Sequence, residues 1–445
     1  MNTPICDFVK KYAQSAALRL HMPGHKGLLR MGMEHLDITE IQGADSLYEA
    51  SGIIAQSERN ASDLFGCATY YSTEGSSQCI RAMLHLAMLY GKSAGREMRV
   101  LACRNAHKTF LSACALLDLK IDWYYSDENS SYLSCIPHAE KLTDVLSKMP
   151  NLPFAFYVTS PDYLGTMADI AEIAEACHQF GVLLLVDNAH GAYLRFLPES
   201  LHPMDLGADM CCDSAHKTLP VLTGGAYLHL ASDLSDLVSN QAKHALALFG
   251  STSPSYLILQ SLDGVNPYLA EYPQLLMEFL HQLSTLKETL IKHGYCLVGN
   301  EPMKLTVSTK PYGYTGEALA ERLLEDNIVC EFADADYLVL MLAPEIGHGG
   351  LERLKSCLLS IPRKTPILQM PPVPSMAQAV MSVREAMMSV CEDIPVEQCE
   401  GRTLAAASVG CPPAVPILVC GAKITQEAIA CFQYYGIEYC TVVKE

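Results

Sequence analysis

Three segments contain residues whose chemistry suits a phosphorylated ligand, and the first is residues 73–77, Thr-Glu-Gly-Ser-Ser. It opens a stretch with helical periodicity. Free amides at a helix N-terminus, a glycine that allows close backbone approach (Gly75) and two hydroxyls (Ser76 and Ser77) suit a phosphate group. An ordinary serine N-cap explains the same residues equally well. Alone, this segment leaves both interpretations open.

The second segment is Asp187 at the end of the apolar run 181–186. A carboxylate at the end of a buried strand needs a cationic partner or several donors, because burying it alone is costly. The pyridinium nitrogen of a cofactor would serve, and so would a structural arginine. An aspartate that caps the next turn is an equal alternative. His190 and Gly191 follow closely.

The third segment surrounds Lys217. A lysine in a pocket has a lowered pKa and can form a Schiff base with an aldehyde. Most lysines are simply solvated, but the context of Lys217 is unusual. An apolar strand candidate precedes it, His216 is adjacent, Ser214 offers a hydroxyl, and the glycine-rich residues 223–225 would let a bulky ligand approach.

The elements that must position these residues alternate between apolar strand-like runs and helical patterns. Strands without polar alternation, separated by helices, indicate a parallel or mixed sheet covered on both faces, with ligands bound beyond the carboxyl ends of the strands. Polar residues collect at those ends: Thr159-Ser160, Asp187 and Asp213-Ser214. The predicted helices are 8–20, 76–90 and 169–180, and the predicted strands are 99–103, 154–159, 181–186, 210–212 and 226–230.

The pattern changes after about residue 265. A helix (275–293), a strand (304–308), a helix (316–326) and a strand (337–342) predict a smaller α/β lobe. A proline-rich stretch, 362–374, precedes the last segment. We expect an N-terminal arm (1–30), a large domain (31–265), a small α/β domain (266–365) and a C-terminal α+β domain (366–445).

Composition excludes several classes of protein. Half of the 445 residues are hydrophobic and 18% are charged, which excludes a disordered or fibrous chain. The net charge of −18 argues against nucleic acid or an anionic membrane as a partner. The N-terminal residues do not read as a signal peptide, and the 18 cysteines contain no CxxC spacing, so we expect reduced, mostly buried thiols and a cytoplasmic protein without a structural metal.

Together, the phosphate-binding helix start, the strand-end Asp187 and Lys217 occur in the order expected of pyridoxal-phosphate (PLP) enzymes with the aspartate-aminotransferase fold, type I. PLP would explain all three: its phosphate on the helix, its pyridine nitrogen on the carboxylate, and its aldehyde on the lysine.

The chain resembles the bacterial ornithine/lysine/arginine decarboxylases of this fold, in a short form without an N-terminal wing domain. The resemblance runs from about residue 4 to the C-terminus. The specific motifs are 187–191, 214–217 and 251–256; the others are 21–26, 37–40, 61–66, 75–77 and 104–108. The implied function is decarboxylation of a basic amino acid to a polyamine or diamine.

The resemblance also implies residue roles. Lys217 would form the Schiff base and Asp187 would pair with the pyridine nitrogen, while Lys26 and Lys108 are weaker candidates for the lysine. His107 would stack on the cofactor ring and His190 would pack beside it. The phosphate would be held by Ser76, Ser77 and Ser214, with Gly75 beside them and Thr252 contributed by the partner subunit of a homodimer. His216 and Lys217 are both candidates to return a proton to the α-carbon.

The C-terminal segment departs from the family pattern. The family usually has Tyr-Pro-Pro-Gly followed by Pro-Gly-Glu, whereas this chain has Cys-Pro-Pro-Ala at 411–414 and Cys-Gly-Ala at 420–422. Ala422 cannot pair with a distal ammonium or guanidinium. Nearby carboxylates along the chain are Asp393, Glu397, Glu400 and Glu427, none in the motif position. The identity of the amino-acid substrate stays open.

Three alternatives compete with this interpretation. An aminotransferase or lyase on the same fold is the first, but Arg353 and Arg363 are not in a recognisable carboxylate-binding motif, which favours decarboxylation. A non-catalytic paralogue is the second, favoured by Ala422 and opposed by Lys217 and Asp187. The third is a metal-dependent hydrolase using His21, His25, His190 and His216, which lack a metal-binding helical spacing.

Overall fold

The structure is a computed structural model that describes residues 1–445 except 127–130, 233, 235, 373–377 and 407–412. It divides into two compact units. The first contains Met1–Glu97 and Ile170–Leu276, and the second contains Met98–Asp169 and Met277–Glu445. This division is based on contacts, and the four-domain division at residues 30, 265 and 365 stays a prediction.

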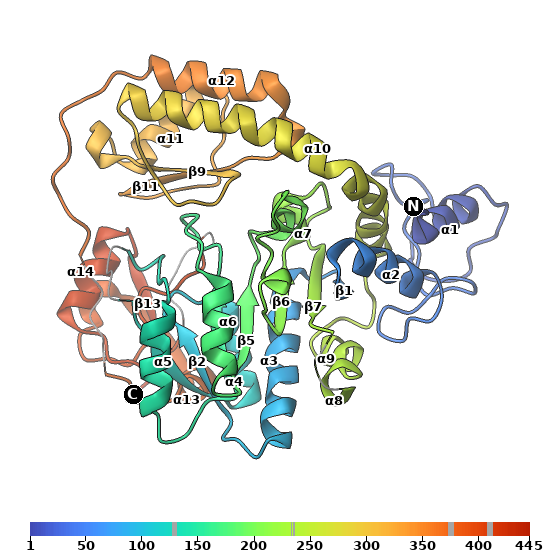
Figure 1. The fold of residues 1–445 in the computed structure, drawn as a ribbon, viewed down its shortest axis with the longest axis horizontal. Coiled ribbons are helices and arrows are strands. Elements are labelled where there is room, and N and C mark those ends of the chain that lie inside the picture. Colours follow the sequence, from blue (N-terminus) through green and yellow to red (C-terminus); the bar gives the residue numbers. More distant parts are fainter. Residues whose placement is uncertain (127–130, 233, 235, 373–377, 407–412) are drawn as a thin grey trace. The chain divides into compact units, whose positions relative to one another are not determined.

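One sheet has seven strands and is mixed and mostly parallel, as predicted for this α/β fold. In the first unit the strand order is β1-β7-β6-β5 (Figure 1). β5 and β6 are parallel, while β6 with β7 and β7 with β1 are antiparallel. Their bounds are β1 Ala68–Ser72, β5 Leu183–Asp187, β6 Met210–Asp213 and β7 Ala226–Leu230. Every residue of β5, β6 and β7 is buried, which explains why these strands are mostly apolar; the polar exceptions are Asp187, Asp213 and His229.

The helices of the first unit confirm the predicted stripe in 76–90 and correct the predicted helix 8–20. Ile80, Met83, Leu84 and Ala87 are all buried in one long helix, α3. The N-terminal helix ends at Ala13, and Leu18 and Leu20 beyond it are 81% and 82% exposed, so the described residues give a longer helix little packing support. The helices are α1 Pro4–Ala13, α2 Ile53–Phe65, α3 Gly75–Ser93, α6 Ile170–His178, α7 Ala215–Thr218, α8 Asp236–Ser239 and α9 Ala242–Leu248, with 3-10 turns at Ala192–Phe196 and Pro203–Asp205.

A long helix, α10, runs from Tyr256 to His293, whereas the sequence predicted a helix only from residue 275. It continues through Pro267 and Pro273, two residues that usually end a helix. Its first half is nevertheless packed: Leu259, Leu262 and Tyr272 are fully buried. Burial of this stripe compensates for the backbone hydrogen bonds that the prolines remove, so tertiary packing overrides the local breakers.

The second unit contains the strand run β4-β2-β3, all parallel, and two smaller sheets. One small sheet has the order β10-β11-β9-β8 and the other pairs β12 with β13. The strands are β2 Arg99–Cys103, β3 Lys120–Tyr124, β4 Ala155–Thr159, β8 Cys296–Val298, β9 Lys304–Ser308, β10 Phe332–Ala333, β11 Tyr337–Met341, β12 Cys391–Pro395 and β13 Tyr439–Val443. The helices are α4 Lys108–Leu117, α5 Ala139–Lys148, α11 Gly316–Glu325, α12 Gly347–Ser360, α13 Val383–Met388 and α14 Gln426–Tyr434, with 3-10 turns at Lys310–Tyr312, Pro344–Ile346 and Val396–Gln398.

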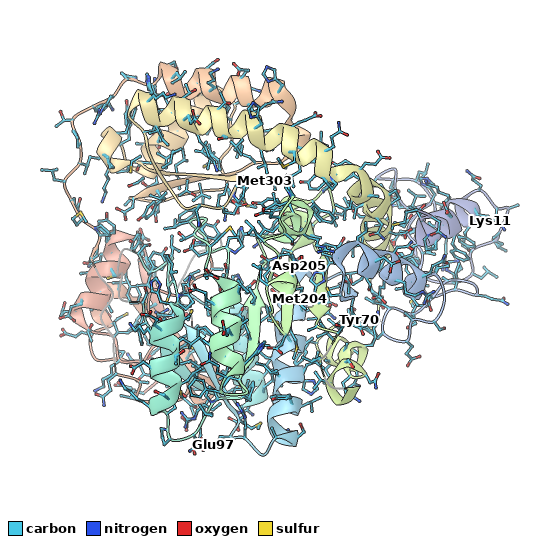
Figure 2. All side chains as sticks on the ribbon, in the orientation of Figure 1. Lys11, Tyr70, Glu97, Met204, Asp205 and Met303 are labelled. Carbon is cyan, nitrogen blue, oxygen red and sulfur yellow. The ribbon has the colours of Figure 1, made fainter. Side chains whose placement is uncertain are left out.

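Cysteines in the described part of the chain are all free, and most are buried, as expected for reduced thiols. Side chains fill the space between the elements drawn as ribbons (Figure 2). Across the described ranges, no helix combines the length and the apolar character needed to cross a membrane.

A buried carboxyl beside β11 makes stability depend on pH. Oδ1 of Asp334 accepts the N–H groups of Asp336 and Tyr337, but Oδ2 accepts no hydrogen bond from the described residues. Burial raises the pKa of Asp334 from 3.8 to about 6. The unfolded chain therefore ionises at lower pH than the folded protein, so this group destabilises the fold as pH rises from about 4 through about 6.

We expect Asp334→Asn to raise the free energy of unfolding by about 2–3 kcal/mol at pH 8, because a shift of one pKa unit is worth about 1.4 kcal/mol. The gain should disappear below about pH 4. Urea unfolding of the full chain across this pH range measures it, with the exposed Glu438→Gln as control. A gain that is independent of pH would contradict the explanation.

Candidate active site

Asp187 lies at the carboxyl end of β5, beside the end of β6. It is 2% exposed and stands in register with Cys212 of β6. Its Oδ1 accepts the N–H of Ala189 at 3.2 Å and lies 3.7 Å from Sγ of Cys212. The carboxylate is therefore held at the end of the sheet where α/β enzymes bind their ligands.

The start of α3 and the end of β6 bring two of the predicted phosphate-binding hydroxyls together. Oγ of Ser214 donates to Oγ of Ser76 at 2.8 Å. Ser76 and Ser77 lie in the first turn of α3, where backbone N–H groups have no partner within the helix. Gly75 has a φ of +71°, and a Cβ added there would meet no described atom within 4 Å. Open space at a helix N-terminus lined with hydroxyls suits a phosphate.

The loop after Lys217 contacts the residues at the start of α3. The Gly75 N–H donates to the Gly224 carbonyl oxygen at 2.8 Å. Gly224 has a φ of +99°, and a Cβ there would come within 2.9 Å of the Thr73 carbonyl oxygen. A glycine is therefore required at position 224 for this close approach. The start of α3 and the loop that follows Lys217 are therefore in direct contact through Gly75 and Gly224.

Lys217 lies in the short helix α7, and its Nζ is 3.1 Å from Nε2 of His190. His190 is 6% exposed and comes from the turn after Asp187. The structure therefore brings together the predicted lysine and one predicted ring-contacting histidine. Nζ can donate this hydrogen bond to His190 Nε2 when that ring nitrogen carries no proton.

His216 has its ring fixed by the glycine-rich loop. Its Nδ1 donates to the Gly225 carbonyl oxygen at 2.9 Å, and its backbone N–H donates to the same oxygen. Burial, and the nearby charge of Lys217, lower the pKa of His216 despite the bond to Gly225. At neutral pH the proton of this ring is on Nδ1, and Nε2 carries none.

These residues fit PLP by the chemistry of their donor groups. Hydroxyls and a helix N-terminus suit the phosphate, a buried carboxylate suits a protonated pyridine nitrogen, and a lysine amine suits the aldehyde. All of them belong to the first unit. They would hold the cofactor with Ser76, Ser77 and Ser214 at one end and Asp187 at the other.

Two predicted residues are not brought into this group by any described contact. His107 belongs to the second unit, where it caps α4 and its Nδ1 accepts the Thr109 N–H at 3.1 Å. Thr252 is exposed in the segment before α10, next to Ser251, whose N–H donates to Glu74. Their roles toward the cofactor stay predictions.

The four histidines of the hydrolase alternative, His21, His25, His190 and His216, do not form a group of possible metal ligands among the described residues. His25 lies 3.2 Å from Asp37, and His21 contacts Tyr12. Within the described ranges the group of possible metal ligands is a different one, His202, Cys211, Asp213 and His229. Sequence reasoning noted Asp213 only as a polar strand end, and it missed His202 and His229, because nothing in their spacing relates them to Asp213.

The comparisons with known proteins show the family of this chain. Residues 3–299 match the family model described as Orn/Lys/Arg decarboxylase, major domain. The arginine decarboxylase of Bacillus subtilis is 30% identical over 96% of this chain and 92% of its own length. That of Halalkalibacterium halodurans is 28% identical over 96% and 92%. The lysine decarboxylase structure from Francisella novicida has a TM-score of 0.81, with 17% identity, and covers 99% of this chain and 81% of its own.

The fold is that of PLP-dependent type I enzymes, and the chain belongs to the Orn/Lys/Arg decarboxylase family. The predicted resemblance, fold class and class of enzyme, a PLP-dependent decarboxylase of a basic amino acid, are confirmed. The aminotransferase and lyase alternatives are not favoured.

Proposed function

We propose that this chain decarboxylates arginine with PLP bound at Lys217. The observation that carries this proposal is the single group formed by Lys217, His190, Asp187, Ser76 and Ser214 at the strand ends of the first unit. Arginine is preferred over lysine and ornithine because four curated relatives of similar length are named arginine decarboxylases.

When bound, PLP supplies an aldehyde for the lysine and the substrate amine, and a ring that accepts the electrons left on the α-carbon when carbon dioxide departs. Asp187 supports this chemistry, because its buried negative charge favours a protonated ring nitrogen. The helix dipole and the hydroxyls of Ser76 and Ser214 hold the phosphate.

We assign the return of a proton to the α-carbon to Lys217 rather than His216. Nε2 of His216 carries no proton at neutral pH, because the ring proton is on Nδ1 and donates to Gly225. Nζ of Lys217 carries protons and has His190 as a hydrogen-bond acceptor 3.1 Å away. Lys217 would therefore serve twice, in holding the cofactor and in moving the proton.

Recognition of the distal cation must use a carboxylate other than the usual glutamate. Ala422 is 4% exposed and packs in an apolar cluster with Leu404, Ile424 and Phe432. Of the carboxylates nearby in sequence, Asp393 accepts a hydrogen bond from Thr441, and Glu400 accepts one from Gln426. Cys411 and Pro412 of the altered motif lie outside the described residues.

Four further proposals rest on the family resemblance. The enzyme would be a homodimer or a larger homo-oligomer, with Thr252 reaching the phosphate of the partner's site. His107 would stack on the cofactor ring. The product would enter polyamine synthesis. The enzyme would be cytoplasmic, with no nucleic acid or membrane partner.

The experiment that tests the function measures carbon dioxide and amine release from arginine, lysine and ornithine with added PLP. We expect release from arginine, with slower or no release from the others. Release from lysine or ornithine alone would overturn the proposed substrate but keep the class of reaction. No release from any of the three, with PLP bound, would indicate an altered substrate or an inactive enzyme.

The paired hydroxyls predict a measurable loss of cofactor affinity. Because each hydrogen bond to an anion contributes about 1.5–3 kcal/mol, we expect Ser76→Ala or Ser214→Ala to raise the PLP dissociation constant about 10-fold. Ser93→Ala, at the other end of α3, is the matched control, since its hydroxyl donates only to Tyr90. Absorbance titration of the apoenzyme with PLP checks this. Unchanged affinity in both single variants would place the phosphate elsewhere.

A further inference from the structure

Cys212 and Asp213, the last two residues of β6, point to opposite faces of the sheet. Side chains alternate along a strand, so Cys212 points to one face, while Cys211 and Asp213 point to the other. Asp187 is in register with Cys212 and contacts it, so it lies on the Cys212 face. Asp213 therefore stands behind the cofactor site rather than in it.

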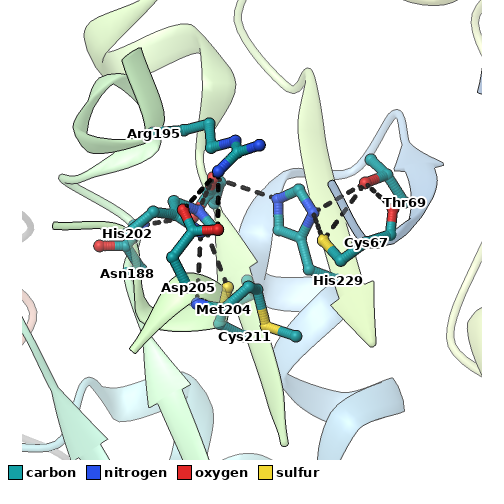
Figure 3. Close-up of polar contacts among 12 residues, drawn as sticks. Cys67, Thr69, Asn188, Arg195, His202, Met204, Asp205, Cys211 and His229 are labelled. Carbon is teal, nitrogen blue, oxygen red and sulfur yellow. Dashed lines mark hydrogen bonds and ion pairs between the residues drawn. The ribbon is translucent and has the colours of Figure 1, made fainter. Parts of the chain in front are cut away.

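Asp213 is fully buried and holds three neighbours. Its Oδ1 accepts Nδ2 of Asn188 at 2.7 Å. Its Oδ2 accepts Nε2 of His202 at 3.0 Å and Nε2 of His229 at 3.1 Å. Figure 3 shows His229 of β7 between this group and the pair Thr69 and Cys67. Burial alone would raise the pKa of Asp213, but attraction to the two histidines and their hydrogen bonds lower it, so the carboxylate is ionised.

The contact with Asn188 joins Asp213 to the turn that follows Asp187. The side chain of Asn188 fits because residue 191 is glycine: a Cβ there would lie 2.0 Å from Asn188 Oδ1. The Asn188 N–H also donates to the Cys212 carbonyl oxygen at 3.0 Å. The ends of β5 and β6 are thus joined on the far face of the sheet, at the two positions next to Asp187 and Ser214.

The same cluster contains four possible metal ligands within 4.8 Å of one another, with Cys211 as the fourth. The hydrogen bonds argue against a metal. Nδ1 of His202 accepts the Met204 N–H at 3.4 Å, so its Nε2 carries the ring proton that it donates to Asp213. Histidine ligands usually donate from the second ring nitrogen, whereas this one accepts. Burial, and then Asp213, raise the pKa of Cys211, which keeps it a thiol.

We infer that Asp213 is a positioning residue of the cofactor site. It holds the strand ends from behind so that Asp187 and Ser214 face the cofactor at a constant separation. His202 and His229 act through Asp213, since both contact the second oxygen of its carboxylate. The inference rests on the proposed function, because it assumes that PLP binds between Asp187 and Ser214.

The test compares PLP binding in variants of this network. Asp213→Asn keeps the size of the side chain but replaces the oxygen that accepts both imidazoles with an N–H donor. We expect about 10- to 100-fold weaker PLP binding and a changed visible circular dichroism of the bound cofactor. His229→Leu should also weaken binding. His229→Gln should restore most of it, because its amide can donate from about the position of Nε2.

Asp263→Asn is the matched control. Asp263 is also fully buried in the first unit, where it accepts hydrogen bonds from Ile5, Cys6 and Ser57. This variant should lower the thermal midpoint without changing PLP affinity, which separates positioning from general stability. Far-ultraviolet circular dichroism of each apoprotein shows whether it is folded.

Three results would overturn the inference. One is wild-type PLP affinity in Asp213→Asn. Another is weakening by His229→Gln as large as that by His229→Leu. The third is a stoichiometric metal in the purified wild type that is lost in Asp213→Asn. Failure of the wild type itself to bind PLP would instead refute the proposed function, so the two failures are distinguishable.

Discussion

Lys217→Ala is expected to lower carbon dioxide release by about 10³-fold or more, because it removes both the covalent attachment of the cofactor and the proposed proton donor. Nζ of Lys217 lies 3.1 Å from Nε2 of His190, and the variant removes this contact. The apoprotein should still fold, since Lys217 is only partly buried. Single-turnover and steady-state assays with arginine measure the loss.

Borohydride trapping of PLP on the wild type, followed by peptide mass spectrometry, identifies the attached lysine. We expect the label on the peptide that contains Lys217 and none in Lys217→Ala. Lys92→Ala is the control, because this exposed lysine lies at the far end of α3, the helix that begins with the proposed phosphate site. A label on Lys26 or Lys108 would show that the cofactor lysine was assigned wrongly.

The second large effect is expected at Asp187. Asp187→Asn keeps the shape of the side chain and the hydrogen bond from Ala189, but it removes the buried negative charge. Without that charge the ring nitrogen is less readily protonated, and the electrons left on the α-carbon are less well stabilised. We expect kcat to fall about 10²- to 10³-fold, with a smaller change in KM.

Asp187→Glu should recover part of the activity, since it keeps the charge at an altered distance. Asp209→Asn is the matched control: Asp209 precedes β6, accepts the Leu184 N–H at 2.7 Å and is not among the cofactor-site residues. A change in KM alone in Asp187→Asn would mean that this carboxylate aids substrate binding and leaves the electron sink to another group.

Much of this protein was determined by local sequence. The buried strands and α3 were predicted because an apolar run indicates a strand buried on both faces, and a helical stripe of apolar residues indicates a helix buried on one face. Lys217, Asp187 and the serines at 76 and 214 were predicted because each follows or opens such an element, and the ends of neighbouring strands must meet at one edge of a sheet. The family motifs are local sequences in these same segments, so the cofactor could also be predicted from the sequence.

Other features depended on contacts between residues far apart in the sequence. The predicted helix 8–20 ends at Ala13, before the exposed Leu18 and Leu20, whereas α10 continues through two prolines because Leu259, Leu262 and Tyr272 are buried. No local pattern could show that His202, Asp213 and His229 would share hydrogen bonds, because strand pairing and a loop bring them together. Sequence periodicity records which side of an element is buried, but only the tertiary structure decides what each buried polar group meets there.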